Sequence, residues 1–205
     1  MSRAVLQSVV FSVSLSLVAA CAGSGGSTSG PLPQTGALAV GAAQRSASSI
    51  ASKPSTVKYT SLYSFKGGTD GEDAWAGLTY VNGTLYGTTL GNGASNHGTV
   101  FAMNMCGKES VLYSFQGGAD GLVPYAGLID VNGVLYGTTG GGGVNNGGTV
   151  FAVSTSGKES VLHNFGSGTD GLNPDSGVID VNGTLYGTTD YGGANGFGTV
   201  FRVSL

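Results

Sequence analysis

Short runs of apolar residues recur along the chain, and each of them has the character of a β-strand. In the clearest stretch the runs are 109–115, 127–131, 134–139 and 149–154. They are rich in Val, Ile, Leu, Phe, Tyr and Thr, and segments rich in Gly or Asn separate them, which is typical of strands joined by turns. The run VFAV at 150–153 is apolar on both faces of a strand, so we expect that strand to be covered on both sides.

The same runs return at a fixed spacing of 50 residues. Three copies span 57–105, 106–155 and 156–205, and the last two copies are identical at 32 of 50 positions. A constant period without insertions predicts a repeat architecture, in which each unit buries its apolar face against the next unit.

The segments between the predicted strands fall into a short class and a long class. One short turn is an Asn-Gly pair, which favours a type I′ hairpin because both residues tolerate positive φ. The pairs are Asn82-Gly83, Asn132-Gly133 and Asn182-Gly183. A second tight turn lies at 155–158, whereas 116–126 and 140–147 are long and rich in Gly. In an up-and-down meander the tight turns share one end of the sheet, and the long loops share the other.

These elements predict an all-β protein made of three tandem four-stranded antiparallel meanders of about 50 residues, similar to β-propeller blades. The run 61–65 stands before the first complete unit and could complete the last one. A β-trefoil and a β-prism are the alternatives, because natural propellers have about four to eight blades. An open arc of three blades would expose apolar faces at both ends, and this predicts association with a second copy into a homo-oligomer.

Five phrases recur in order over residues 61–205: LYSF-x-GG-x-DG, AGL, NG-x-LYGTT, GG and GTVF. They resemble the GloVer tandem repeat of bacterial surface proteins. The resemblance implies an exported protein whose repeats follow a signal peptide and are held at the cell surface by one of several anchors. It implies no established reaction, and we expect no cofactor.

The N-terminal part has a different composition from the repeats. Residues 1–21 carry one basic residue and then a mostly apolar run, which is typical of a signal peptide. Val18-Ala19-Ala20-Cys21 resembles a lipobox, which implies lipidation of Cys21 and a membrane-anchored or extracellular surface location. Residues 22–56 are dominated by Gly, Ser, Ala, Thr and Pro, so we expect a flexible linker.

Charge separates the two parts of the chain and excludes one class of partner. The repeats hold all 11 acidic residues and five of the eight basic ones, a balance of 5 − 11 = −6. An acidic domain repels phosphate backbones, so nucleic acid is not an expected partner.

The constant 50-residue spacing also places an aspartate at the same position of a long loop in each repeat, at Asp70, Asp120 and Asp170. An Asp before Gly in a loop usually bonds backbone N–H groups of a turn, and we interpret these residues as structural. Calcium prefers six to eight oxygen ligands, so one acid per loop does not indicate a metal site. His97 and His163 are the only histidines, and neither lies in a catalytic or zinc-binding pattern.

The long loops vary most between the copies, and variable loops on a constant scaffold commonly carry binding function. The candidate ligand-binding residues are Trp75, Tyr125, Asp175, Tyr191, Asn195 and Phe197. We expect a surface-tethered binding or scaffold module with a glycan or protein ligand. Lectin-like sugar binding by these loops is one alternative. Hydrolysis by loop carboxylates such as Asp70 and Asp175 is another.

Overall fold

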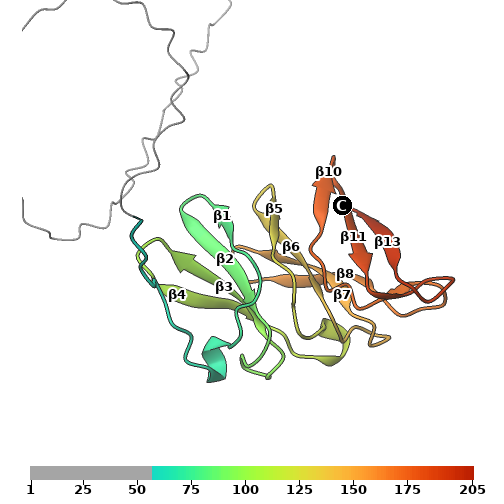
Figure 1. Cartoon of the computed structure of the whole chain (residues 1–205), viewed down its shortest axis with the longest axis horizontal. Coiled ribbons are helices and arrows are strands. Elements are labelled where there is room, and N and C mark those ends of the chain that lie inside the picture. Colours follow the sequence, from blue (N-terminus) through green and yellow to red (C-terminus); the bar gives the residue numbers. More distant parts are fainter. Residues whose placement is uncertain (1–56) are drawn as a thin grey trace, which may run out of the picture. The chain divides into compact units, whose positions relative to one another are not determined.

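The computed structural model describes residues 57–205, which form an all-β fold (Figure 1). The predicted signal segment, the linker and Cys21 lie outside the described residues. Each strand of the first four-stranded sheet corresponds to one of the predicted runs. The strands of that sheet are β1 (Thr79–Val81), β2 (Thr84–Thr89), β3 (Thr99–Asn104) and β4 (Glu109–Ser114). No helix among residues 57–205 has the length and apolar character needed to cross a membrane.

Two further sheets repeat this arrangement. Sheet 2 consists of β5 (Ile129–Val131), β6 (Val134–Thr139), β7 (Thr149–Ser154) and β8 (Glu159–Asn164). Sheet 3 consists of β10 (Ile179–Val181), β11 (Thr184–Thr189) and β13 (Thr199–Ser204). The loops contain the short elements η1 (Gly68–Asp70), η2 (Gly118–Asp120), β9 (Gly171–Leu172) and β12 (Tyr191–Gly192).

All three sheets are antiparallel meanders with the same register. Neighbours in each sheet follow the chain order, from β1 to β4, from β5 to β8, and from β10 through β11 to β13. A glycine of the LYGTT phrase always faces a phenylalanine of the GTVF phrase, as in Gly137 opposite Phe151. The prediction of an all-β fold built from repeated meanders is confirmed.

The sheets are out of phase with the sequence repeats. The run at the start of the second repeat forms β4, the last strand of sheet 1, and the rest of that repeat forms sheet 2. Sheet 3 therefore has three strands rather than the expected four. The expectation of a strand at 61–65 was wrong, because no strand among residues 57–205 lies beside this segment to bond its backbone.

The three sheets lie side by side (Figure 1), and the apolar core lies between adjacent sheets. One apolar cluster joins sheet 1 to sheet 2 and includes Val100 and Leu135. A second cluster joins sheet 2 to sheet 3 and includes Val150 and Leu185. Each boundary also contains an edge-to-face pair of phenylalanine rings, which is a favoured aromatic geometry. These pairs are Phe115–Phe151, with centroids 5.0 Å apart, and Phe165–Phe201, at 4.9 Å.

The predicted hairpin turns have the backbone conformation that a type I′ turn requires. Asn132 has φ 55° and Gly133 has φ 83°, and the equivalent pairs in the other repeats match them. In the next strand, Gly137 leaves room for the ring of Phe151, whose Cζ would lie 2.7 Å from a Cβ at that position. The recurring glycine of LYGTT is therefore needed for close packing within the sheet.

The three-residue strands β1, β5 and β10 are neighbours and form one edge of the array of sheets, which we call the inner edge. Side chains bond the sheets to one another near this edge. Thr138 Oγ1 donates to the carbonyl of Ser176 at 2.9 Å, and Thr88 Oγ1 donates to that of Ala126 at 3.1 Å. Thr79 Oγ1 also donates to the carbonyl of Leu128. These bonds fix the positions of the loops that precede β5 and β10.

Candidate ligand-binding site

Two long loops of each repeat meet at the end of the sheet opposite the tight turns, and we call this end the long-loop face. In the second repeat they are 115–128 and 140–148, and backbone bonds connect them. Leu122 donates to the carbonyl of Gly141 at 2.9 Å, and Gly141 donates back at 3.1 Å. The third repeat extends the same contact into the β9–β12 pair. These backbone bonds therefore hold the two long loops of a repeat in a fixed arrangement.

Backbone bonds also connect the long loops of successive repeats. The N–H of Val123 donates to the carbonyl of His97 at 3.0 Å, and that of Asn173 donates to Gly147 at 2.9 Å. Val123 has φ 56°, an unusual conformation for a β-branched residue, and Asn173 has φ 54°. Residues 123–125 of one repeat and 173–175 of the next both lie against residue 140.

An open cavity of about 520 Å³ lies where the second and third repeats meet on the long-loop face. Its lining combines an aromatic ring, amide side chains and backbone. The lining residues are Leu122, Val123, Tyr125, Gly140, Gly141, Asn146 and Asn173. Most of them belong to the second repeat, and Asn173 belongs to the third. Pockets with a few convergent polar groups are the usual sites of small-ligand binding.

Asp175 lies beside this cavity, and one of its carboxylate oxygens is buried without a hydrogen-bond partner among residues 57–205. Gly140 has no room for a side chain, because a Cβ there would collide with the Asp175 carboxylate and lie 2.9 Å from the Tyr125 ring. The Oδ1 atom of Asp175 is buried and accepts no hydrogen bond from residues 57–205. Burial, and then the negative charge of Asp190, raise the pKa of Asp175. An unsatisfied buried oxygen gains free energy from any donor that reaches it.

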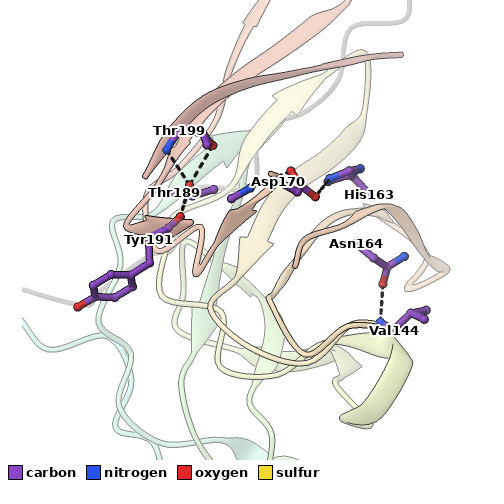
Figure 2. Close-up of polar contacts among 8 residues, drawn as sticks. Val144, His163, Asn164, Asp170, Thr189, Tyr191 and Thr199 are labelled. Carbon is purple, nitrogen blue, oxygen red and sulfur yellow. Dashed lines mark hydrogen bonds and ion pairs between the residues drawn. The ribbon is translucent and has the colours of Figure 1, made fainter. Parts of the chain in front are cut away.

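The structure brings two of the six candidate binding residues together. Tyr125 and Asp175 both pack against Gly140, although 50 residues separate them. Trp75 is exposed in the first repeat, and Asn195 and Phe197 are exposed in the third. Tyr191 is in β12, and Figure 2 shows its ring pointing away from the polar contacts around Thr189.

Sequence reasoning missed Asn146 and Asn173, which line the cavity. Both have positive φ, and Asn is one of the few residues that adopt this conformation readily. An Asn in a long loop is therefore first interpreted as a turn residue. Its place in the cavity becomes visible only when the second and third repeats are packed together. Comparison of the repeats offers one signal for Asn173, because this polar residue occupies the position of the apolar Val123 in the repeat before.

The recurring loop aspartates are engaged elsewhere. Asp70 accepts hydrogen bonds from the hydroxyl of Tyr63 and the N–H of Lys66, both at 2.8 Å. Asp120 accepts the same pair of bonds from Tyr113 and Gln116. In the third repeat His163 replaces the tyrosine and lies 2.9 Å from Asp170 (Figure 2). Each carboxylate thus ties a loop to the strand or segment before it.

Two glutamates face two of these aspartates, Glu109 facing Asp70 and Glu159 facing Asp120. The pKa of Glu159 is raised to about 7 by burial and by the charge of Asp120. The pKa of Glu109 is likewise raised to about 7 by burial, with Asp70 the charge beside it. One oxygen of each glutamate is buried and makes no hydrogen bond within residues 57–205. Among those residues, no three His, Cys, Asp or Glu side chains gather closely enough to hold a metal ion.

Comparison with known proteins identifies the family of these repeats. A family model described as the Gloeobacter/Verrucomicrobia repeat matches residues 20–205, which is most of the chain. The chain belongs to this family. The match confirms the family resemblance expected from the recurring phrases. Among curated proteins, none matches the chain. In this Gloeobacter/Verrucomicrobia repeat protein, the candidate site therefore rests on the geometry of the long loops.

Proposed function

We propose that this chain is an exported, surface-tethered binding module, and that the cavity between the second and third repeats holds its ligand. The observation that carries the proposal is the buried, unpaired carboxylate oxygen of Asp175 beside the Tyr125 ring. This oxygen lies under the cavity wall against Gly140, so a hydrogen-bond donor on a ligand would satisfy it as the loops move apart around the ligand, while the aromatic ring offers a flat apolar contact. Asn146 and Asn173 add amide groups that can both donate and accept.

The chemistry favours a ligand rich in hydroxyl groups, such as a glycan. A sugar presents donors to a carboxylate, acceptors to amide N–H groups and C–H faces to an aromatic ring. Lectin-like binding is therefore the form of the proposal that we favour. A protein ligand would need a flatter and larger surface than a cavity of about 520 Å³ offers. Hydrolysis by Asp70 is less favoured, because Tyr63 and Lys66 already occupy its carboxylate.

A glycan array probed with the purified full chain tests this proposal. Tyr125→Ala and Asp175→Asn should each weaken binding of a positive glycan about tenfold, equal to about 1.4 kcal/mol. Tyr80→Asp is the matched control, because Tyr80 is exposed on β1 and the other two repeats carry Asp130 and Asp180 at that position. Unchanged binding by both cavity variants would place the ligand elsewhere.

The surface tether is a separate part of the proposal and needs its own test. The lipobox-like Val18-Ala19-Ala20-Cys21 precedes a linker whose composition suits a flexible spacer. Intact-mass analysis of the membrane fraction should find a chain that begins at Cys21 with acyl groups attached. Cys21→Ser should move the protein to the soluble fraction. A mature soluble protein that begins elsewhere would contradict lipidation and leave the cavity proposal untouched.

A further inference from the structure

The two ends of the array of sheets carry complementary halves of the junction that joins adjacent sheets. Val150 packs toward sheet 3 and is fully buried, whereas the equivalent Val200 of sheet 3 is 80% exposed. At the other end, Leu128 packs against sheet 1 and is 4% exposed, whereas the equivalent Leu78 is 51% exposed. Each end therefore lacks the neighbour that the internal junctions supply.

Backbone groups at the two ends match in the same way. Within the chain, the N–H of Val123 donates to the carbonyl of His97 in the repeat before it. The residue equivalent to Val123 in the first repeat is Asp73, and the residue equivalent to His97 in the third repeat is Phe197. Neither group has such a partner among residues 57–205. Asp73 nevertheless has φ 56°, the same value as Val123, so its N–H is already held in the orientation that the junction uses.

Side chains at the ends follow the same rule. His97 packs onto Gly117 of the next repeat, whereas Phe197, at the equivalent position, is 92% exposed. Pro124 packs against Gly98, and a Cβ on that glycine would lie 2.7 Å from the proline Cδ. The equivalent of Pro124 in the first repeat is Ala74, which is exposed. A neighbouring sheet would cover both Phe197 and Ala74.

Strand β13 also has a free edge where sheets 1 and 2 have a fourth strand. In those sheets Val100 lies opposite Tyr113, and Val150 lies opposite His163. The same register requires a strand whose Tyr63-like residue lies opposite Val200. Only the segment 59–64 continues this 50-residue series, with Tyr63 at the required place.

The segment that contains Tyr63 is already seated on sheet 1 as β4 is seated on sheet 2. The Phe65 ring packs edge-to-face on Phe101 at 5.1 Å, as Phe115 packs on Phe151. The carbonyl oxygen of Leu62 lies against Gly107, as that of Leu112 lies against Gly157. Beside the segment, a groove of about 380 Å³ lined by Leu78, Phe101 and Met103 remains open.

We propose that two copies of this chain associate head to tail, so that sheet 3 of each copy packs on sheet 1 of its partner. Segment 59–64 of each copy becomes the fourth strand of the partner's sheet 3. The register places Val200 opposite the partner's Tyr63 and Thr199 opposite the partner's Ser64. Six sheets then form a closed ring, within the range of about four to eight blades found in propellers.

A second copy fits these ends because the junction is a continuation of contacts that the chain already makes twice. A head-to-tail interface forms a ring when its rotation closes, and two identical junctions then bury both exposed ends. Arg202 is a departure, since Ala102 and Ala152 hold its position in the other repeats. Its aliphatic stem can cover apolar surface while the guanidinium reaches the rim of the junction.

Light scattering coupled to size exclusion tests the proposal with the full chain at micromolar concentration. The expected mass is that of two chains. Val200→Glu and Ala74→Glu should each give a single chain, because both place an unpaired charge in the junction. Both residues are exposed within one copy, so neither substitution should disturb folding. Val144→Glu is the matched control, an exposed valine on a loop of sheet 2, and should leave the mass at two chains.

Mixing the two variants tests the head-to-tail arrangement. A Val200→Glu chain and an Ala74→Glu chain can form one intact junction together, although neither can form one alone. An equimolar mixture should therefore regain a two-chain species, and amide exchange at 60–64 should slow in that species. A wild-type single chain would overturn the proposal. So would an Ala74→Glu variant that keeps the two-chain mass, or wild-type assemblies larger than two chains.

Discussion

At the scale of single residues, a threonine pair explains why the phrases GTT and GTVF recur together. The hydroxyl of Thr139 lies 2.8 Å from that of Thr149, accepts its N–H at 3.1 Å and donates to the carbonyl of Gly141 at 3.0 Å. Both threonines are fully buried. Figure 2 shows the same arrangement for Thr189 and Thr199. One hydroxyl thus satisfies two backbone groups where a long loop leaves the sheet.

We predict that Thr139→Val lowers the free energy of unfolding by about 1–3 kcal/mol, because it leaves the Thr149 N–H buried without a partner and removes one of the two donors to the Gly141 carbonyl. Urea denaturation measures the change. Thr184→Val is the matched control, since the second repeat already has Val134 at that position, and it should change stability by less than about 0.5 kcal/mol. Equal losses from both variants would mean that the methyl-for-hydroxyl exchange itself is costly.

The two half-buried glutamates, Glu109 and Glu159, give stability an unusual dependence on pH. Their folded pKa values of about 7 lie above the ordinary value of 4.5, so the folded state binds more protons between these limits. Stability should therefore fall as pH rises from about 4.5 to about 7. The charged or titratable groups that face Glu159 are Asp120 and Tyr113, and those that face Glu109 are Asp70, Tyr63 and Lys66.

The double variant Glu109→Gln/Glu159→Gln should lose most of this pH dependence and be more stable than the wild type above pH 7. Urea midpoints measured across the range test this. Glu72→Gln, in which an exposed loop acid changes, is the control and should keep the wild-type slope. A wild-type midpoint that rises between pH 4.5 and pH 7 would contradict the expected sign.

At the scale of elements, strands with strong local signals could be predicted from the sequence. The run 134–139 and the turn Asn132-Gly133 appear as expected, because apolar alternation and positive-φ residues act locally. The segment 61–65 has a composition similar to that of β4 but is not a strand. Strand formation needs a hydrogen-bonded neighbour, and the composition of a segment does not specify one.

The hairpin turn supplies an element-scale prediction. Gly133 has φ 83°, and an added Cβ would meet no atom within 4 Å, so any cost of substitution is conformational. Gly133→Ala should lower the free energy of unfolding by about 1–2 kcal/mol. Gly133→Asn should cost less, because Asn adopts positive φ more easily. Thermal unfolding of the two variants side by side measures the difference, and an Ala variant as stable as the Asn variant would refute the explanation.

At the scale of the whole molecule, the sequence indicated the number of repeats but not where they meet in space. Tyr125 and Asp175 were separate candidates in the sequence, and their meeting at Gly140 depends on how sheet 2 packs on sheet 3. Such packing is set by contacts between repeats, including the Asn173 N–H bond to Gly147. A repeat period predicts the structure of one unit. It does not predict how neighbouring units are placed relative to each other, because that placement depends on the surfaces that pack together.

The boundaries between sheets should also control cooperativity, since in repeat proteins nearest-neighbour interfaces couple the units. Phe115 is fully buried between sheets 1 and 2, and Phe165 is fully buried between sheets 2 and 3. Phe115→Ala should lower stability by about 3–5 kcal/mol.

Trp75, the single tryptophan, lies in the first repeat and reports on that end of the array. In Phe115→Ala its fluorescence should change at lower urea than the far-UV circular dichroism does. In Phe165→Ala the dichroism should begin to change first, because sheet 3 is the unit released. Coincident transitions in both variants would show that the sheets unfold as one unit even with a boundary weakened.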